Sequence, residues 1–257
     1  MKWNGSVTVI TGASRGIGAA VARAAAAKGA RLALLARAKD ELEQVLSSSG
    51  GDGIAVACDI AERGSAEDAL ARVARELGPV DILVNNAGIG SYGKIQDTDV
   101  ELFERIMRVN YFGTVYATKA VLPSMIERKN GHIVNIASIN GRVGAPMEAA
   151  YSASKFAVAA LSEALWFELR PKGVNVSLIN PGPVETHFFE ARGSEYARTF
   201  PKKVPAERIA RAVIKAVESN KFETYIPGWL AFPPAMKAVV PPMYRMGTAS
   251  NFKKELG

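Results

Sequence analysis

Tyr151 and Lys155, four positions apart, are the side chains in this sequence best suited to proton transfer. Residues with this spacing share one face of a helix, so the lysine ammonium would lie beside the phenol. A free phenol has a pKa near ~10 and is a poor acid/base at neutral pH, whereas an adjacent cation stabilises the phenolate and lowers that pKa. The pair therefore predicts an acid/base centre, although such a pair in isolation is more often an exposed helical pair.

A glycine-rich loop near the start of the chain reads TGASRGIG over residues 11–18. Glycines let the backbone approach a pyrophosphate closely, and the helix that follows supplies free N–H groups and partial positive charge at its N-terminus. The spacing G-x-x-x-G-x-G is neither the dinucleotide fingerprint G-x-G-x-x-G nor a P-loop. The loop predicts a phosphate-binding turn, and a strand-to-helix turn without a ligand is the alternative.

Apolar strands alternate with helices along the chain, which predicts a doubly wound α/β fold with a parallel sheet covered on both faces. Capping-box patterns at Ser65 with Asp68 and at Thr98 with Glu101 predict two helix starts. No linker divides the sequence, so we predict one domain over residues 1–257. We predict strands over residues 7–11, 32–36, 54–58, 81–84, 132–137 and 174–179, and helices over residues 17–28, 39–46, 65–77, 102–126, 151–170 and, last, 206–217.

Further polar and glycine residues follow the predicted strands in order. Together with the glycine loop and Tyr151-x-x-x-Lys155, they match at family-like spacing over about residues 5–190, and the chain resembles the short-chain dehydrogenase/reductase superfamily. The resemblance implies a single-domain, Rossmann-like sheet of about seven strands. The matching positions are Asp59 after the third strand, Asn85, Asn86, Ala87 and Gly88 after the fourth, Asn110 in the long helix, Ser138 at the end of the fifth-strand region, and Pro181, Gly182 and Thr186 after the sixth.

The resemblance also implies roles for individual residues. Ser138 would hydrogen-bond the substrate oxygen, Tyr151 would protonate it, Lys155 would hold the nicotinamide ribose and tune Tyr151, and Asn110 would support a proton-relay water. Hydride would come from the cofactor. The cofactor-binding residues implied are Gly12, Ser14, Arg15, Gly16, Ile17, Gly18, Arg37, Asp59, Ile60, Asn86, Ala87, Gly88, Tyr151, Lys155, Pro181, Gly182, Val184 and Thr186.

The end of the second predicted strand bears on the choice of cofactor. An acid about 20 residues beyond the glycine loop would bind the ribose 2′-hydroxyl of NAD, but this sequence has Ala36 and Arg37 there. No carboxylate would repel a 2′-phosphate, and Arg37 and Arg15 can approach one, so we predict NADP(H). The alternative is that both arginines are solvated surface charges.

Composition excludes several classes of protein. The 257 residues carry a formal net charge of +7, one cysteine and two histidines, so neither an internal disulfide nor a Cys/His metal site is expected. No secretory signal precedes the first strand, which predicts a reducing, cytoplasmic location. The basic residues are scattered among acids and match no nucleic-acid-binding motif, so we predict no nucleic-acid partner. Cys58 is expected to be a small buried side chain, and His187 is placed where it can touch substrate.

The end of the chain differs from the rest in composition. We predict a mobile substrate lid over about residues 183–204, containing Phe188 and Phe189, and a variable C-terminal segment over residues 221–257. Five prolines in that segment exclude a spanning helix. Its apolar and aromatic residues fit a flap over a lipophilic substrate, a subunit contact, or a membrane-surface patch aided by Lys237, Arg245, Lys253 and Lys254.

These observations predict an NADP(H)-dependent oxidoreductase that transfers hydride between the nicotinamide and a carbonyl or alcohol substrate, with a lipophilic substrate expected from Phe188, Phe189 and Trp229. The alternative is a non-catalytic NADP-binding or scaffold protein on the same fold. By resemblance, the protein is expected to form a homo-oligomer, a dimer or tetramer, through the helices that hold Asn110 and Tyr151.

Overall fold

The computed structural model describes residues 1–196 and 200–256. Its strands are β1 (Val7–Thr11), β2 (Arg31–Ala36), β3 (Gly53–Ala57), β4 (Ile82–Asn85), β5 (Gly131–Ile136), β6 (Val174–Pro181), β7 (Val184–Glu185), β8 (Val204–Pro205) and β9 (Glu223–Ile226). Its helices are α1 (Gly16–Ala26), α2 (Lys39–Ser48), α3 (Arg63–Leu77), α4 (Val100–Met107), α5 (Gly113–Glu127), α6 (Ala149–Leu169), α7 (Phe188–Ala191), α8 (Ala206–Ser219), α9 (Phe232–Val239), α10 (Pro241–Asn251) and α11 (Lys253–Leu256).

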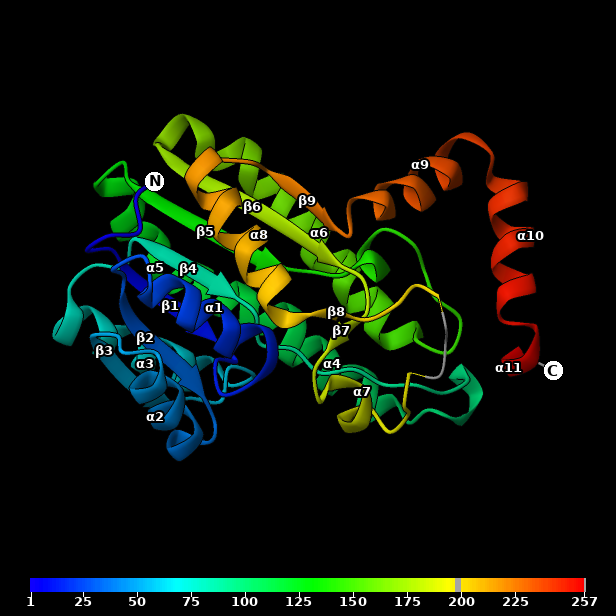
Figure 1. The fold of residues 1–257 in the computed structure, drawn as a ribbon, viewed down its shortest axis with the longest axis horizontal. Coiled ribbons are helices and arrows are strands. Elements are labelled where there is room, and N and C mark those ends of the chain that lie inside the picture. Colours follow the sequence, from blue (N-terminus) through cyan, green and yellow to red (C-terminus); the bar gives the residue numbers. More distant parts are fainter. Residues whose placement is uncertain (197–199, 257) are drawn as a thin grey trace.

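Seven of the strands form one parallel sheet in the order β3-β2-β1-β4-β5-β6-β9 (Figure 1). Every residue of β1, β4 and β5 is buried, as expected for parallel strands with helices on both faces. Two short strands, β7 and β8, pair separately. The predicted doubly wound α/β fold is therefore confirmed, and β9 is a strand that the sequence pattern did not indicate.

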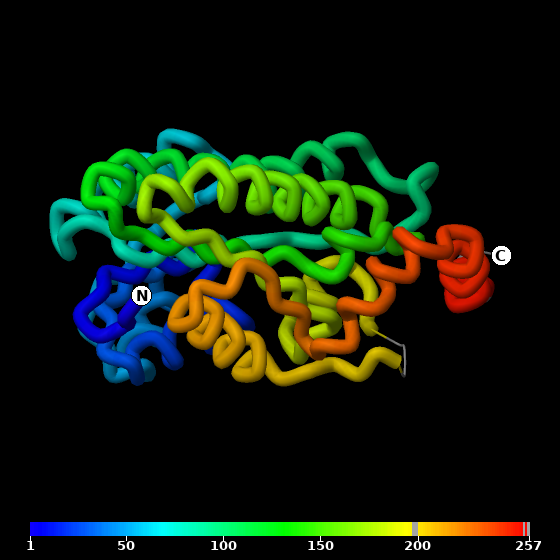
Figure 2. The backbone as a smooth tube through the Cα atoms, turned by 90° about the horizontal axis from the view of Figure 1, so that it is seen from above, coloured from blue at the N-terminus to red at the C-terminus, as the bar shows by residue number. Residues whose placement is uncertain are grey.

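Two helical layers cover the sheet, one on each face (Figure 2). On one face α1, α2 and α8 pack on the strands through side chains such as Val21, Leu42 and Val213. On the other face α3, α5 and α6 do so through side chains such as Val73 and Met125. Because all neighbouring strands of this sheet are parallel, their carboxyl ends share one edge, where ligands bind in open α/β sheets.

The predicted helix starts at the two capping boxes were wrong. Helix α3 begins at Arg63 without a side-chain cap, and Ser65 instead accepts a hydrogen bond from the backbone N–H of Asp59 at 3.0 Å. Helix α4 begins at Val100, while the Thr98 hydroxyl donates to the Lys94 carbonyl at 2.9 Å. In both places the hydroxyl satisfies the preceding loop rather than the helix.

The last predicted helix is not the last helix in the structure. Helices α9 and α10 follow it, and each begins with proline in its first turn, where the missing N–H costs nothing. Four of the five prolines that were expected to exclude a spanning helix therefore lie in the first turns of these two short helices. Figure 1 shows α9 and α10 extending from the carboxyl edge of the sheet. Residues 197–199 of the predicted lid, the side chain of Lys254 and Gly257 lie outside the described residues.

Candidate active site

The glycine loop forms a tight turn between β1 and α1. Gly12 and Gly16 have φ angles of +63° and +55°, which a side chain would strain. A Cβ added to Gly12 would lie 2.8 Å from the Ala87 Cα atom, and one added to Gly18 would lie 2.6 Å from the Asn86 Nδ2 atom. The turn therefore leaves the backbone N–H groups at the start of α1 accessible to an anion, and its packing has room only for glycine.

Asn86 holds this turn in place. Its Nδ2 donates to the backbone carbonyls of Thr11 at 2.9 Å and Gly12 at 3.0 Å. Asn85, the preceding residue, points into the protein and donates to Asn135 Oδ1 at 2.9 Å. The segment after β4 is thus tied both to the glycine loop and to β5, which fixes the floor of the site.

Asn110 lies in a π-helical turn, Arg108–Phe112, that joins α4 to α5. Its Oδ1 accepts from the Ile89 N–H at 2.8 Å, and its Nδ2 donates to the Ile89 carbonyl at 2.9 Å and to Ser154 Oγ at 2.9 Å. Its backbone carbonyl accepts from the Thr114 hydroxyl at 2.9 Å. Such π-turns occur often at functional sites. Here the side chain clamps the loop after β4 against α6.

Ser138, Tyr151 and Lys155 converge at the carboxyl ends of β5 and β6. Tyr151 and Lys155 lie one turn apart on α6, with Lys155 Nζ 5.8 Å from the centre of the Tyr151 ring. Nζ donates to the Ile136 carbonyl at 2.9 Å, which anchors the amine to the end of β5. The Ser138 Oγ accepts from the backbone N–H of Asn140 at 3.1 Å.

Burial dominates the acid/base properties of this pair. It raises the pKa of the Tyr151 phenol well above its ordinary value, an effect that a hydrogen bond with Ser138 only partly offsets. It lowers the pKa of the Lys155 ammonium to about 8. The expected lowering of the phenol pKa by Lys155 is therefore not found in the protein alone. The phenol therefore carries its proton at physiological pH.

One cavity of about 2080 Å³ runs from the glycine loop past Tyr151 to α10. This volume exceeds the roughly 300–1,000 Å³ of a typical ligand pocket, so it has room for a dinucleotide and a substrate together. Ser138 and all of the predicted cofactor-binding residues except Gly18 line it. Gly18 and Asn110 lie behind the wall and shape it through Asn86 and Ile89.

The two predicted phosphate-binding arginines differ in their surroundings. Both are exposed and line the cavity. Arg15 Nη2 lies 3.2 Å from Glu41 Oε1, so this guanidinium already has a partner. Asp59, also exposed, accepts through Oδ1 from the backbone N–H of Ala61 at 3.0 Å, as in a turn. Arg37, directly after β2, forms no ion pair within residues 1–196 and 200–256.

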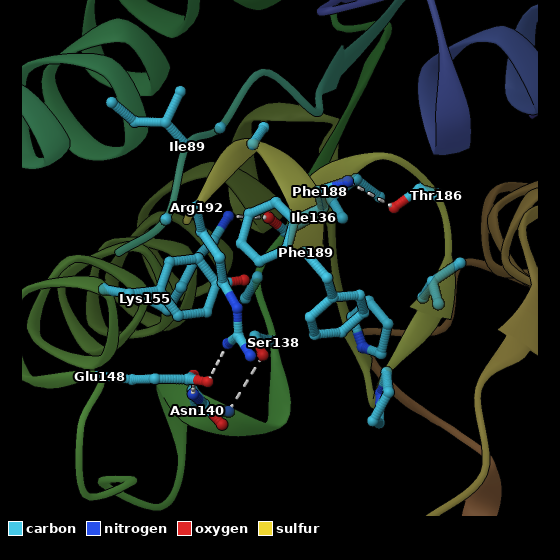
Figure 3. Close-up of a pocket in the computed structure, with 18 of the residues that line it drawn as sticks. Ile89, Ile136, Ser138, Asn140, Glu148, Lys155, Thr186, Phe188, Phe189 and Arg192 are labelled. Atoms are coloured by element: carbon cyan, nitrogen blue, oxygen red, sulfur yellow. Dashed lines mark hydrogen bonds and ion pairs between the residues drawn. The ribbon is translucent and has the colours of Figure 1, made fainter. Parts of the chain in front are cut away.

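An aromatic and charged group covers the substrate end of the cavity (Figure 3). The Phe188 ring lies 5.3 Å from the Tyr151 ring, centre to centre, and Tyr151 is 9% exposed. Sequence reasoning did not identify Asn140, Glu148 and Arg192, which form an ion pair and a hydrogen bond beside Ser138. The available signal was the position of Glu148, three residues before Tyr151 and directly before α6. His187 is exposed and also lines the cavity.

Cys58 is buried, and burial raises the pKa of its thiol, which fits a structural side chain. The residues that the structure describes include no group of three or more His, Cys, Asp or Glu side chains able to hold a metal ion. Within the same ranges, each helix is too short or too polar to cross a bilayer.

The strand order, the glycine turn after β1 and the Tyr151/Lys155 pair on α6 define a Rossmann-like oxidoreductase that binds a nicotinamide cofactor. The family model described as short chain dehydrogenase matches residues 6–197. The chain belongs to this family, whose members act on CH–OH and C=O groups.

Relatives and solved structures agree with this assignment. The chain is 35% identical to "Dehydrogenase/reductase SDR family member 7B" of Mus musculus, over 97% of this chain and 82% of the relative. A short chain dehydrogenase/reductase from Burkholderia phymatum in complex with NAD has a TM-score of 0.83 at 28% identity, covering 90% of this chain and 92% of that one. An alcohol dehydrogenase from the archaeon Thermococcus sibiricus complexed with 5-hydroxy-NADP has a TM-score of 0.77 at 30% identity, covering 86% and 95%.

Proposed function

We propose that the protein is an NADP(H)-dependent oxidoreductase that transfers hydride between the nicotinamide and a lipophilic carbonyl or alcohol substrate. One observation carries the proposal: Ser138, Tyr151 and Lys155 meet in a buried corner of the same cavity that the glycine loop opens into. The glycine turn, the start of α1 and the loop after β4 fit a dinucleotide, because the positive φ angles of Gly12 and Gly16 form a tight turn that leaves the backbone N–H groups at the start of α1 for its phosphates.

Each catalytic residue has a role that its surroundings support. Ser138 donates a hydrogen bond to the substrate oxygen and holds it near the phenol. Tyr151 donates its proton to that oxygen during reduction and takes it back during oxidation. Lys155 and Asn110 hold the ribose side of the site and the loop after β4. When bound, the nicotinamide supplies the hydride for reduction and accepts it in oxidation.

The preference for NADP(H) rests on Arg37. It follows β2, where NAD-binding sheets carry an acid, and it lines the cavity without an ion pair to any side chain that the structure describes. Arg15 is a weaker candidate because Glu41 shares its charge. A structural relative binds NAD and another binds a modified NADP, so the family admits both cofactors.

A lipophilic substrate is supported by the side chains around the far end of the cavity. Phe188 and Phe189 of α7 line it together with Trp229, Met236 and Tyr244 from the segment beyond β9. We assign residues 183–196 and 200–204 to a lid and residues 221–256 to a variable segment within one domain. We also assign a cytoplasmic location. We assign a homo-oligomer as well, which is supported by two exposed aromatic side chains, Phe112 just before α5 and Phe167 on α6.

A substrate panel with matched variants tests the proposal. Apolar and small polar carbonyl compounds are incubated with NADPH or NADH, and cofactor oxidation is followed. We expect Tyr151→Phe to lower kcat by about 10²–10⁴-fold with dinucleotide affinity unchanged, which would separate the enzyme from a non-catalytic NADP-binding protein. Full turnover in Tyr151→Phe contradicts the mechanism, and turnover of small polar carbonyls alone contradicts the lipophilic substrate.

Arg37→Ala tests the cofactor preference in the same assay. Loss of a charge-assisted hydrogen bond should raise the KM for NADPH by about tenfold or more and leave the KM for NADH nearly unchanged. The control is Arg72→Ala, which removes an exposed arginine on α3 that pairs with Glu76. Equal KM changes for both cofactors would show that Arg37 does not bind the 2′-phosphate.

A further inference from the structure

A charged pair inside the cavity joins the segment after β7 to the start of α6. Arg192, which directly follows α7, forms an ion pair with Glu148, the residue before α6. The Arg192 side chain is 4% exposed and that of Glu148 is 15% exposed, whereas the chain's other ion pairs in the described residues are more exposed. A pair buried this deeply is costly unless its geometry and hydrogen bonds are complete.

The guanidinium of Arg192 is held on every side. It lies over the Tyr92 and Phe189 rings, 4.7 Å from the centre of each, and its Nε donates to the Ser194 carbonyl at 3.3 Å. Tyr92 belongs to the loop between β4 and α4, so one side chain contacts three separate segments around the cavity. Cation–π contacts of this kind gain strength when desolvated.

Glu148 links Arg192 to the catalytic serine through Asn140. Its second carboxylate oxygen accepts from Asn140 Nδ2, and the Asn140 backbone N–H donates to Ser138 Oγ at 3.1 Å (Figure 3). Met147, just before Glu148, has a φ of +67°, a left-handed conformation that is rare for a non-glycine residue. Strained backbone of this kind persists where surrounding contacts over-determine it.

The segment that Arg192 fastens also covers the catalytic phenol. Phe188 packs against Tyr151 with ring centres 5.3 Å apart, so α7 covers one side of the phenol while Tyr151 still lines the cavity. We propose that the Arg192–Glu148 pair fastens residues 188–196 over the cavity and, through Asn140, sets the position of Ser138. Arg192 and Glu148 are then positioning residues that couple closure of the lid to assembly of the catalytic centre.

The two charges of the pair act on the pKa of Tyr151 in opposite directions. Glu148 raises the pKa of the phenol and Arg192 lowers it, so the pair together leaves Tyr151 less perturbed than Glu148 would alone. If Arg192 moves away with the lid, Glu148 is left as an unpaired carboxylate in a buried site. Pairing therefore favours the closed position.

The test compares Glu148→Gln, Arg192→Met and the double variant, with Arg128→Met as control. Arg128 pairs with Asp81 at 2.7 Å near the opposite ends of the strands, and the two side chains are 28% and 21% exposed, so the control breaks a partly buried pair away from the cavity. Glutamine keeps the shape of Glu148 and its contact with Asn140, and methionine keeps apolar contact with the Tyr92 and Phe189 rings.

Backbone hydrogen exchange of residues 188–196 is measured without added ligand, and KM and kcat are measured with a carbonyl compound that the wild type reduces. We expect exchange to quicken about 100-fold in either single variant, the size expected when one member of a buried pair is left unpaired. KM should rise more than kcat falls, and the double variant should recover part of both effects.

The control should leave the exchange of residues 188–196 and both kinetic constants near wild-type values. Exchange in the single variants equal to that in the control overturns the proposal, as does a loss confined to kcat. The kinetic readout rests on the proposed reaction, whereas exchange does not. If the proposed function is wrong, Tyr151→Phe will retain turnover. If the Arg192–Glu148 pair does not fasten the lid, the hydrogen exchange of residues 188–196 will be unchanged in the single variants.

Discussion

Acidification from pH 7 to pH 5 should destabilise this protein through one buried histidine. His132 lies in β5, the strand that leads to Ser138, and is 0% exposed. Its Nε2 contacts Ser177 Oγ at 2.9 Å, and its Nδ1 has no hydrogen-bond partner within the described residues. Burial lowers the pKa of His132 from 6.5 to about 3, because the imidazolium would lose its hydration.

The magnitude follows from the two pKa values. An unfolded histidine takes up a proton near pH 6.5, and the folded one only near pH 3, so the unfolded chain binds more protons between these values. The contribution to stability is present above about pH 6.5 and is lost as pH falls. Between pH 7 and pH 5 the loss is about 2 kcal/mol, and it continues at roughly 1.4 kcal/mol per pH unit towards pH 3.

Urea denaturation at pH 7, 6 and 5 measures the free energy of unfolding of the wild type, His132→Gln and His187→Gln. Carboxylates contribute to the slope in all three proteins, so the difference between slopes isolates each histidine. We expect the free energy of unfolding to fall by about 2 kcal/mol less between pH 7 and pH 5 in His132→Gln than in the wild type. His187→Gln is the matched control, because it replaces an exposed histidine outside the sheet. Equal slopes in the wild type and His132→Gln would refute the reasoning.

Two further substitutions test the site. Gly18→Ala should clash with Asn86, lower the free energy of unfolding by about 1–3 kcal/mol and weaken dinucleotide binding measured by calorimetry. The matched control, Gly64→Ala in α3, meets nothing within 4 Å and should be neutral or stabilising, so equal losses in both would contradict the packing argument. Lys155→Met removes a buried amine whose pKa is about 8 and should lower kcat by about 10²–10⁴-fold without unfolding the protein in circular dichroism. Wild-type kcat in that variant would show that the amine has no part in the reaction.

Local sequence patterns determined most of the fold and part of the site. Alternating apolar strands and helices predicted the six strands β1 to β6 because residues buried on both faces form continuous apolar runs. The glycine turn and the spacing of Tyr151 and Lys155 predicted their placement because φ above zero and the helical period are properties of adjacent residues. Helices α9 and α10 at the proline-rich end of the chain were not predicted, because proline both breaks a helix and begins one.

Only the tertiary structure decided how these groups behave. Glu148 and Arg192 are 44 positions apart, so no local pattern pairs them. They meet because the segment after β7 lies over the start of α6. The pKa values of Tyr151 and Lys155 likewise depend on burial, which follows from the packing of Phe188 and the end of β5. Spacing along the chain fixes which residues are neighbours on a helix, whereas desolvation depends on every segment that excludes water from them.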